Sequence, residues 1–133
     1  MRVVIDTNVL VSGLLSPYGA TGEIVRMLAA GSLDLLYDAR IISEYESVLT
    51  RPKFSFEKAH IDNLIEFIVN YSIPVSAIPL SRHLPDGDDE PFLEVAISGK
   101  AECLITGNVA HYPIKSRRKM RILTPRQFLN RYF

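Results

Sequence analysis

Three carboxylate side chains lie where they could bind a metal ion. Asp6 directly follows an apolar run at residues 3–5, Glu44 lies in the segment ISEYESVL, and Asp89 lies in PDGDDEPFLEVA. Carboxylate oxygens, with water completing the shell, suit Mg²⁺ or Mn²⁺, and there is no cluster of Cys and His for zinc. The sequence therefore predicts an all-oxygen site for Mg²⁺ or Mn²⁺, with Asp6, Glu44 and Asp89 as ligands.

The position of Asp6 has two interpretations. The short apolar run before it is typical of a buried strand, and in open parallel sheets ligands bind beyond the carboxyl ends of the strands. Asp6 would then lie at a ligand-binding edge. Asp, Thr and Asn are also good N-caps, and a helix is expected to begin near Val9. This segment alone supports both interpretations equally.

Helical spacing places the other two carboxylates near apolar stripes. Glu44 and Glu46 each lie about 100° from Tyr45 around a helix, so the spacing does not determine which one faces a cleft. Asp89 continues the apolar stripe of residues 92–96 and is therefore expected on the buried face. A buried carboxylate needs a partner, and a cation would serve. Solvated glutamates, and acids that stabilise a helix N-terminus, are the ordinary alternatives.

The elements that must position these residues alternate along the chain. The expected strands are residues 2–5, 34–37, 73–78, 103–106 and 121–123, and the expected helices are residues 9–15, 22–30 (with Thr21 as N-cap), 41–49, 57–71, 92–98 and 125–132. Strands separated by helices imply βαβ units. We expect an α/β fold with a central parallel sheet of four to five strands, in one domain that covers residues 1–133.

Composition excludes few functions. The chain has 133 residues, of which 47% are hydrophobic, and its 15 Lys and Arg balance its 15 Asp and Glu, so net charge does not favour nucleic acid or membrane. The single cysteine, Cys103, cannot form an intrachain disulfide and is expected to be a buried core thiol. No signal peptide or membrane span is expected, which predicts a soluble, cytoplasmic protein with no membrane partner.

Four segments together resemble the PIN-domain family. VVIDTNVLVSGL, ISEYESVLTRPKF, DGDDEPFLEVA and CLITGN come in the order and spacing of that family, and are most similar to its subgroup of toxins from toxin–antitoxin systems. The resemblance implies a three-layer α/β/α nuclease fold, metal-dependent cleavage of RNA, and frequently a homodimer that a small antitoxin inhibits. It places the family's three acids on Asp6, on Glu44 rather than Glu46, and on Asp89.

The resemblance also indicates supporting residues and one departure. Thr7 and Asn8 match the family's opening and Thr106 its later loop, and with Asn108 they are expected to orient ligands or substrate. Many relatives have an aspartate after the fourth strand, where this chain has Asn108 and His111. Because neither supplies a fixed negative charge, a second metal would be held more weakly.

RNA binding would need basic side chains. The run KSRRKMR places Lys115, Arg117, Arg118 and Lys119 in a loop after CLITGN, where they could bind phosphates. A solvated charged loop is an equally good interpretation.

The function predicted from these residues and the resemblance is hydrolysis of RNA phosphodiesters by a Mg²⁺- or Mn²⁺-dependent endoribonuclease, the toxin of a type II toxin–antitoxin system. One alternative is a PIN scaffold that binds RNA or protein without cleavage, which the missing fourth acid favours. A phosphoacceptor receiver domain is a weaker alternative, because it requires paired acids after the first strand and a lysine after a later one, and Asp6 stands alone.

Overall fold

The protein is built on a parallel sheet. The structure, a computed structural model, describes every residue from Met1 to Phe133. Its strands are β1 (Arg2–Ile5), β2 (Asp34–Tyr37), β3 (Ile73–Pro74), β4 (Cys103–Ile105) and β5 (Ile122–Leu123). They lie in the order β3-β2-β1-β4-β5, and every neighbouring pair is parallel. The prediction of a parallel sheet is confirmed, with five strands.

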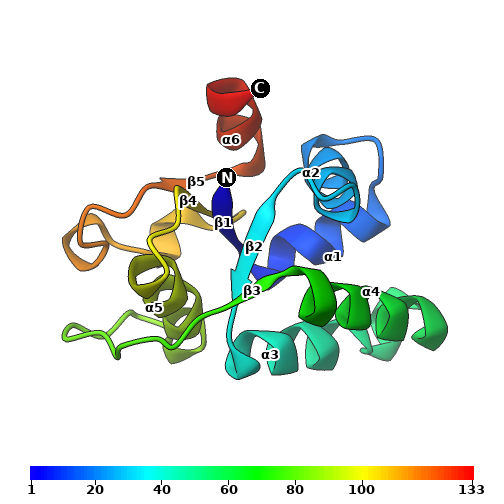
Figure 1. Cartoon of the computed structure of the whole chain (residues 1–133), viewed down its shortest axis with the longest axis horizontal. Coiled ribbons are helices and arrows are strands. Elements are labelled where there is room, and N and C mark those ends of the chain that lie inside the picture. The colour runs from blue at the N-terminus through cyan, green and yellow to red at the C-terminus, as the bar shows by residue number, and fades with distance from the viewer.

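Helices cover both faces of this sheet. They are α1 (Thr7–Leu15), α2 (Ala20–Ala29), α3 (Ala39–Leu49), α4 (Lys58–Tyr71), α5 (Glu90–Ser98) and α6 (Pro125–Tyr132). Helix α5 packs on β1, β2 and β4, while α2 packs against α1 and α6. Figure 1 shows α5 on one side of the strands and α2 and α6 on the other, with the α3–α4 pair beside α1. The expected three-layer α/β/α fold is confirmed.

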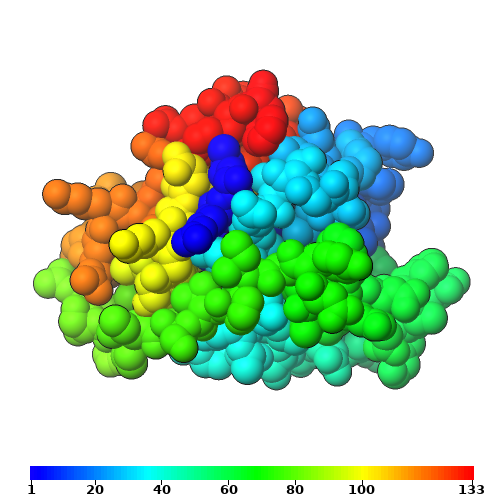
Figure 2. Space-filling view, viewed as in Figure 1, coloured from blue at the N-terminus to red at the C-terminus, as the bar shows by residue number.

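The middle strands form the centre of the hydrophobic core. Residues 3–5 of β1 and 103–105 of β4 are fully buried, because helices cover both faces of these strands. Cys103 is therefore a buried thiol, and burial raises its pKa to about 12. Figure 2 shows the start of the chain, in blue, between the segments near residues 100 and 35, as expected from the pairing of β1 with β4 and β2. No helix combines the length and hydropathy needed to cross a bilayer.

Four helices, α1, α2, α3 and α5, each begin two residues earlier than the sequence pattern indicates. Helix α1 starts at Thr7, two residues before the expected helix. Helix α2 starts at Ala20 and has Gly19 as its N-cap, so the prediction of Thr21 as the cap is wrong. The Thr21 hydroxyl instead lies 3.0 Å from the Ser12 hydroxyl and links α2 to α1.

The expected strand at residues 73–78 is wrong in its second half. Strand β3 contains only Ile73–Pro74, and the chain then leaves the sheet. The Ile78 N–H donates to the Ser98 hydroxyl of α5 at 2.9 Å, so a helix side chain replaces a strand partner. The other elements match their expected ranges to within two residues.

Candidate active site

Asp6 lies where β1 ends, beside β4 and the start of α1. The residue is 5% exposed, and its N–H donates to the Ile105 carbonyl at 2.9 Å. Its Oδ2 accepts hydrogen bonds from the hydroxyls of Thr106 and Tyr112, each at 2.9 Å. Asp6 occupies the N-cap position of α1, but its side chain makes no capping hydrogen bond. The carboxylate therefore belongs to the edge of the sheet, and the helix-cap interpretation does not account for it.

Tyr112 is a site residue that the sequence analysis missed. It is fully buried directly after the 3₁₀ turn η3 (Val109–His111). Burial, and then the charge of Asp6, raise the pKa of the Tyr112 hydroxyl, which stays a donor. Tyr112 and Thr106 both donate to Oδ2 of Asp6, which leaves Oδ1 without a side-chain donor. No feature of the sequence marks Tyr112, since its loop has no periodicity.

Glu44 approaches the same region from α3. Its Oε2 accepts a hydrogen bond from the Thr7 hydroxyl. Because Thr7 follows Asp6 directly, this hydrogen bond fixes Glu44 relative to the end of β1. Burial raises the pKa of Glu44, and the nearby charge of Asp6 raises it further. Burial therefore disfavours the charged form of Glu44 most, and the carboxylates of Asp6, Asp88 and Asp86 add to this effect.

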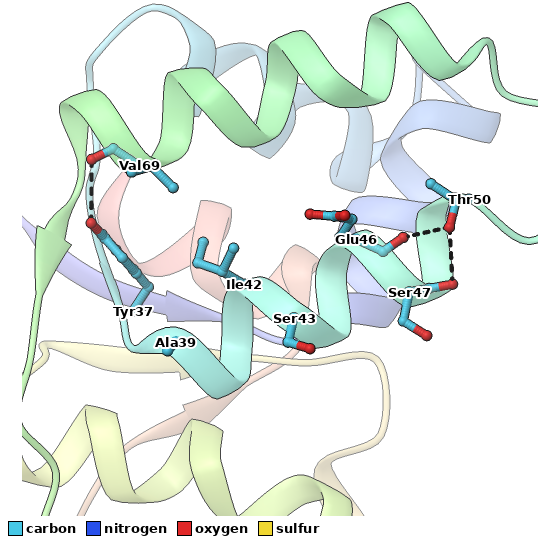
Figure 3. Close-up of a pocket in the computed structure, with 8 residues that line it drawn as sticks. All are labelled: Tyr37, Ala39, Ile42, Ser43, Glu46, Ser47, Thr50 and Val69. Carbon is cyan, nitrogen blue, oxygen red and sulfur yellow. Dashed lines mark hydrogen bonds between the residues drawn. The ribbon is translucent and has the colours of Figure 1, made fainter.

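Glu46 lies on the other side of α3. It lines a groove of about 630 Å³ together with Tyr37, Ile42 and Val69. Figure 3 shows this groove between α3 and α4, with Glu46 and Ile42 directed into it. The structure therefore separates the two glutamates that helical spacing left equivalent, and Glu44 is the one that faces Asp6.

Asp89 lies at the start of α5, after the 3₁₀ turn η2 (Gly87–Asp89), and its side chain is 14% exposed. Its Oδ2 is the one buried side-chain oxygen or nitrogen of the protein without a hydrogen-bond partner. The His111 Nδ1 lies 3.3 Å from this oxygen without making a hydrogen bond to it. Burial, followed by the charges of Asp6 and Asp86, raises the pKa of Asp89 to about 6. An unpartnered buried carboxylate oxygen is costly and calls for an additional ligand.

The loop after β4 is held by side-chain hydrogen bonds. The Thr106 hydroxyl donates to Asp6 and accepts from the Asn108 N–H at 3.0 Å. The Asn8 Oδ1 accepts from the Gly107 N–H at 2.9 Å, and its Nδ2 is 3.5 Å from the Thr106 hydroxyl. Thr106 thus positions Asp6, while Asn8 ties the start of α1 to this loop.

An open cleft of about 500 Å³ lies between α1 and α3 beside these residues. The polar residues that line it are Thr7, Asn8, Ser12, Ser16, Glu44, Arg51, Asp86, Asp88 and Asp89. Asp86 and Asp88 are exposed, and the Asp86 side chain accepts from the Asp88 N–H at 2.9 Å in the turn before α5. Glu44 and Asp89 both line this cleft, and Asp6, which does not line it, directly precedes the lining residue Thr7.

A divalent cation fits this donor set. No three Asp, Glu, His or Cys side chains are arranged to bind one ion directly, so at least one carboxylate would bind through water, as is common for Mg²⁺. A cation would give the Asp89 Oδ2 a partner and offset the charges that raise the pKa of Glu44 and Asp89. All the candidate ligands are oxygens, which suits Mg²⁺ or Mn²⁺.

The sequence pattern of the PIN-domain family matches residues 2–110 of the chain. The chain belongs to the PIN-domain family. This confirms the resemblance of its four segments, and members of the family are generally nucleases that use divalent metal ions.

This PIN domain is similar in sequence to one curated protein and in fold to a solved structure. An uncharacterised protein of Methanocaldococcus jannaschii is 24% identical and covers 99% of this chain and 92% of its own length. The crystal structure of VapBC2 from Rickettsia felis, bound to a DNA fragment from their promoter, contains a chain that is similar with a TM-score of 0.60 and 14% identity. That match covers 93% of this chain and 98% of the other, and it shows a shared fold.

The fourth acid of many PIN domains is absent here. Asn108 and His111 occupy the loop after β4, and both are exposed. The imidazole of His111, from this loop, lies beside Asp89. The protein therefore has fewer negative charges for a second cation than relatives with an aspartate in this loop.

In the basic run after this loop, one arginine is held by contacts within the protein and three other basic side chains are exposed. The Arg117 Nε donates to the Tyr112 carbonyl at 2.6 Å, so Arg117 holds the loop that carries Tyr112. Lys115, Arg118 and Lys119 are exposed, and Arg118 and Lys119 have positive φ angles of 49° and 67°. Phosphate binding by these residues stays a prediction.

Proposed function

We propose that residues 1–133 form a single PIN domain that acts as a Mg²⁺- or Mn²⁺-dependent endoribonuclease. The observation that carries the proposal is the buried, unpartnered Oδ2 of Asp89, close to Asp6 and Glu44 at the carboxyl edge of the sheet. Ligands bind at this edge in open parallel sheets. A cation-binding carboxylate cluster in a solvent-accessible cleft is what metal-assisted phosphodiester hydrolysis requires.

Each residue of the site would have its own role in hydrolysis. A bound divalent cation supplies activation of water and neutralises charge at the phosphoryl group. Asp6 would hold the cation through Oδ1, because Thr106 and Tyr112 occupy Oδ2 and fix the orientation of the carboxylate. Thr7 would orient Glu44 in the same way. Asp89 must lose its proton before it can bind a cation, and its pKa of about 6 permits this at neutral pH.

The proposal is tested by cleavage of single-stranded RNA of mixed sequence with Mg²⁺, with Mn²⁺ and with EDTA. We expect cutting with either metal, none with EDTA, and none by Asp6→Asn. The matched control is Asp34→Asn, an exposed aspartate at the start of β2 that pairs with the N-terminal amine. Cleavage by a folded Asp6→Asn protein at the parent rate would disprove the assignment of Asp6.

A second candidate is a PIN scaffold that binds RNA or protein without cleaving it. The exposed Asn108 and His111, in place of the fourth acid, favour this candidate. Its signature would be RNA binding without metal-dependent turnover. Because the chain belongs to the PIN-domain family, we set the receiver-domain alternative aside.

The proposed biological role is that of a toxin with a small antitoxin partner, and the proposed assembly is a homodimer that acts in the cytoplasm. The resemblance of the four segments to PIN toxins supports the role. Exposed apolar side chains such as Leu15, Val69 and Ile114, which are 53%, 45% and 81% exposed, offer surface for a partner. Light scattering of the purified protein tests the assembly, and co-expression with a small neighbouring reading frame tests the antitoxin.

A further inference from the structure

The cleft between α1 and α3 is lined by a cationic and an aromatic side chain as well as by carboxylates. Residues 51–54, Arg-Pro-Lys-Phe, follow α3, and their last three residues form the 3₁₀ turn η1 (Pro52–Phe54). We name residues 51–54 the RPKF turn. Arg51 and Phe54 line the same cleft as Glu44, and Arg51 is the only Lys, Arg or His among the residues that line it.

The two ends of the cleft are separated along α3. Glu44 precedes Leu49, the last residue of α3, by five residues, which is roughly 7 Å of helix rise, and Arg51 lies two residues beyond the end of the helix. Val48 of α3 and Val11 of α1 line the cleft between them. Arg51 and the carboxylates thus come from different parts of the cleft lining, as a site for two neighbouring phosphates of one strand would require.

Arg51 forms no ion pair, unlike Arg40, and no hydrogen bond to a backbone carbonyl, unlike Arg117. Arg40 contacts Asp38 and Glu94 at 2.7 Å each. Arg117 is likewise committed to a backbone carbonyl. An exposed guanidinium without a carboxylate partner can bind a phosphate through two parallel hydrogen bonds.

Phe54 adds an aromatic surface beside this cation. Its ring stacks on Phe56, with centroids 5.7 Å apart and planes inclined by 22°. Lys53 contributes a second cation, its Nζ being 5.0 Å from the Phe54 ring centroid. The turn is closed by the Ser55 N–H, which donates to the Pro52 carbonyl at 3.1 Å. A fixed aromatic ring among cations is the arrangement with which proteins bind unpaired nucleotides.

We propose that the RPKF turn binds a nucleotide of single-stranded RNA next to the one that is cut, with Arg51 on its phosphate and Phe54 stacked on its base. The inference rests on the proposed function and deepens it, because it names an unpaired strand as the substrate. A base in a duplex has no free face for Phe54. An acidic peptide is the competing occupant, and it is disfavoured because Glu44, Asp86, Asp88 and Asp89 line the same cleft.

The test is binding of a short fluorescent single-stranded RNA in EDTA at several salt concentrations, measured by anisotropy. Arg51→Gln should weaken binding about tenfold and reduce the slope of log K against log salt by about 0.7, the value for one phosphate bound on a single strand. Phe54→Leu should weaken binding about fivefold or more with the slope unchanged, as loss of stacking does. Arg51→Lys should keep the slope.

The control is Arg126→Gln, an exposed arginine on α6 outside the cleft, which should change neither affinity nor slope. In the cleavage assay with Mg²⁺, Arg51→Gln should raise KM and leave kcat within about twofold. If Arg51→Gln and Phe54→Leu bind RNA as tightly as the parent protein, the inference is wrong. If these variants instead lose binding of a protein partner, the RPKF turn is a protein-docking site. A parent that binds RNA through these residues but never cuts it would uphold the inference and refute the nuclease.

Discussion

Helix α3 separates two hollows of similar size and different chemistry. The α3–α4 groove, of about 630 Å³, contains Glu46 and several apolar side chains, and none of its residues has a buried polar atom without a partner. The α1–α3 cleft, of about 500 Å³, contains the unpartnered Oδ2 of Asp89 and carboxylates whose pKa is raised. Unpartnered and neighbouring carboxylates, and not volume, therefore identify the candidate site. Glu44 and Glu46, two residues apart, point to different sides of α3, and the packing of α4 against α3 decides which hollow each one lines.

The largest difference between the two hollows is expected when each glutamate is changed to glutamine. Glu44→Gln removes a candidate ligand and should lower RNA cleavage about 100-fold or more. Glu46→Gln changes the same chemical group on the opposite side of α3 and should leave cleavage within about twofold. The measurement is the initial rate with saturating Mg²⁺. Equal rates for the two variants would mean that the comparison between the hollows does not locate the active site.

A second large effect is expected at Tyr112. Tyr112→Phe deletes one of the two hydroxyls that donate to Oδ2 of Asp6 and keeps the buried ring. The carboxylate should lose its fixed orientation, and the affinity for Mn²⁺ should fall about tenfold, the lower range for groups that orient metal ligands. Calorimetric titration measures this, with Tyr132→Phe as the control tyrosine on α6. An unchanged affinity would show that Thr106 alone orients Asp6.

The strands that position Asp6 could be predicted from the sequence, whereas the contact between Tyr112 and Asp6 could not. Residues 2–5 and 34–37 were predicted as strands, because short apolar runs in βαβ proteins indicate buried strands. The position of Asp6 at a strand end followed from them. Tyr112 could not be found, because its hydrogen bond to Asp6 joins residues 106 positions apart and depends on the folded loop.

The choice between Glu44 and Glu46 also needed the structure. Both lie at the same angle from Tyr45, and only the packing of α4 against α3 distinguishes their sides. The family resemblance favoured Glu44, whose side chain faces Asp6 in the structure. In the second half of residues 73–78, the pattern of apolar residues predicted a strand, but hydrogen bonding to α5 prevailed over the sheet. The catalytic roles of Asp6, Glu44 and Asp89 stay predictions.

A moderate effect concerns pH and stability in the absence of metal. Because the pKa of Asp89 is about 6 in the folded protein and lower in the unfolded chain, the folded state favours the protonated form, and ionisation of Asp89 opposes folding as the pH rises through 6. Asp89→Asn should therefore be more stable than the parent at pH 8 by about 1 kcal/mol, allowing for solvent screening, or ~4 °C in Tm.

This gain should be largely absent at about pH 4, where Asp89 is protonated in the folded parent and about half protonated in the unfolded chain. Thermal unfolding in EDTA across this pH range measures it. Addition of Mg²⁺ at pH 8 should stabilise the parent and not Asp89→Asn. A Tm difference that is the same at pH 4 and pH 8 would show that the charge of Asp89 is not the cause.

The smallest expected effect lies in the basic loop after β4. Neutralising Arg118 and Lys119, which are exposed, should lower RNA affinity about threefold and reduce the salt slope by about 0.7 for each phosphate that the loop no longer binds. The measurement is the anisotropy titration described for the RPKF turn. An unchanged slope would leave these side chains as solvated charges and would concentrate RNA binding in the α1–α3 cleft.

Binding of Mn²⁺ to the α1–α3 cleft, followed by electron paramagnetic resonance, tests whether Asp6 and Asp89 form a metal centre. The parent and Glu46→Gln should bind Mn²⁺ equally, and Asp6→Asn and Asp89→Asn should each bind it at least about tenfold more weakly. Mn²⁺ binding that both aspartate substitutions leave unchanged would contradict the claim that these carboxylates form the metal centre.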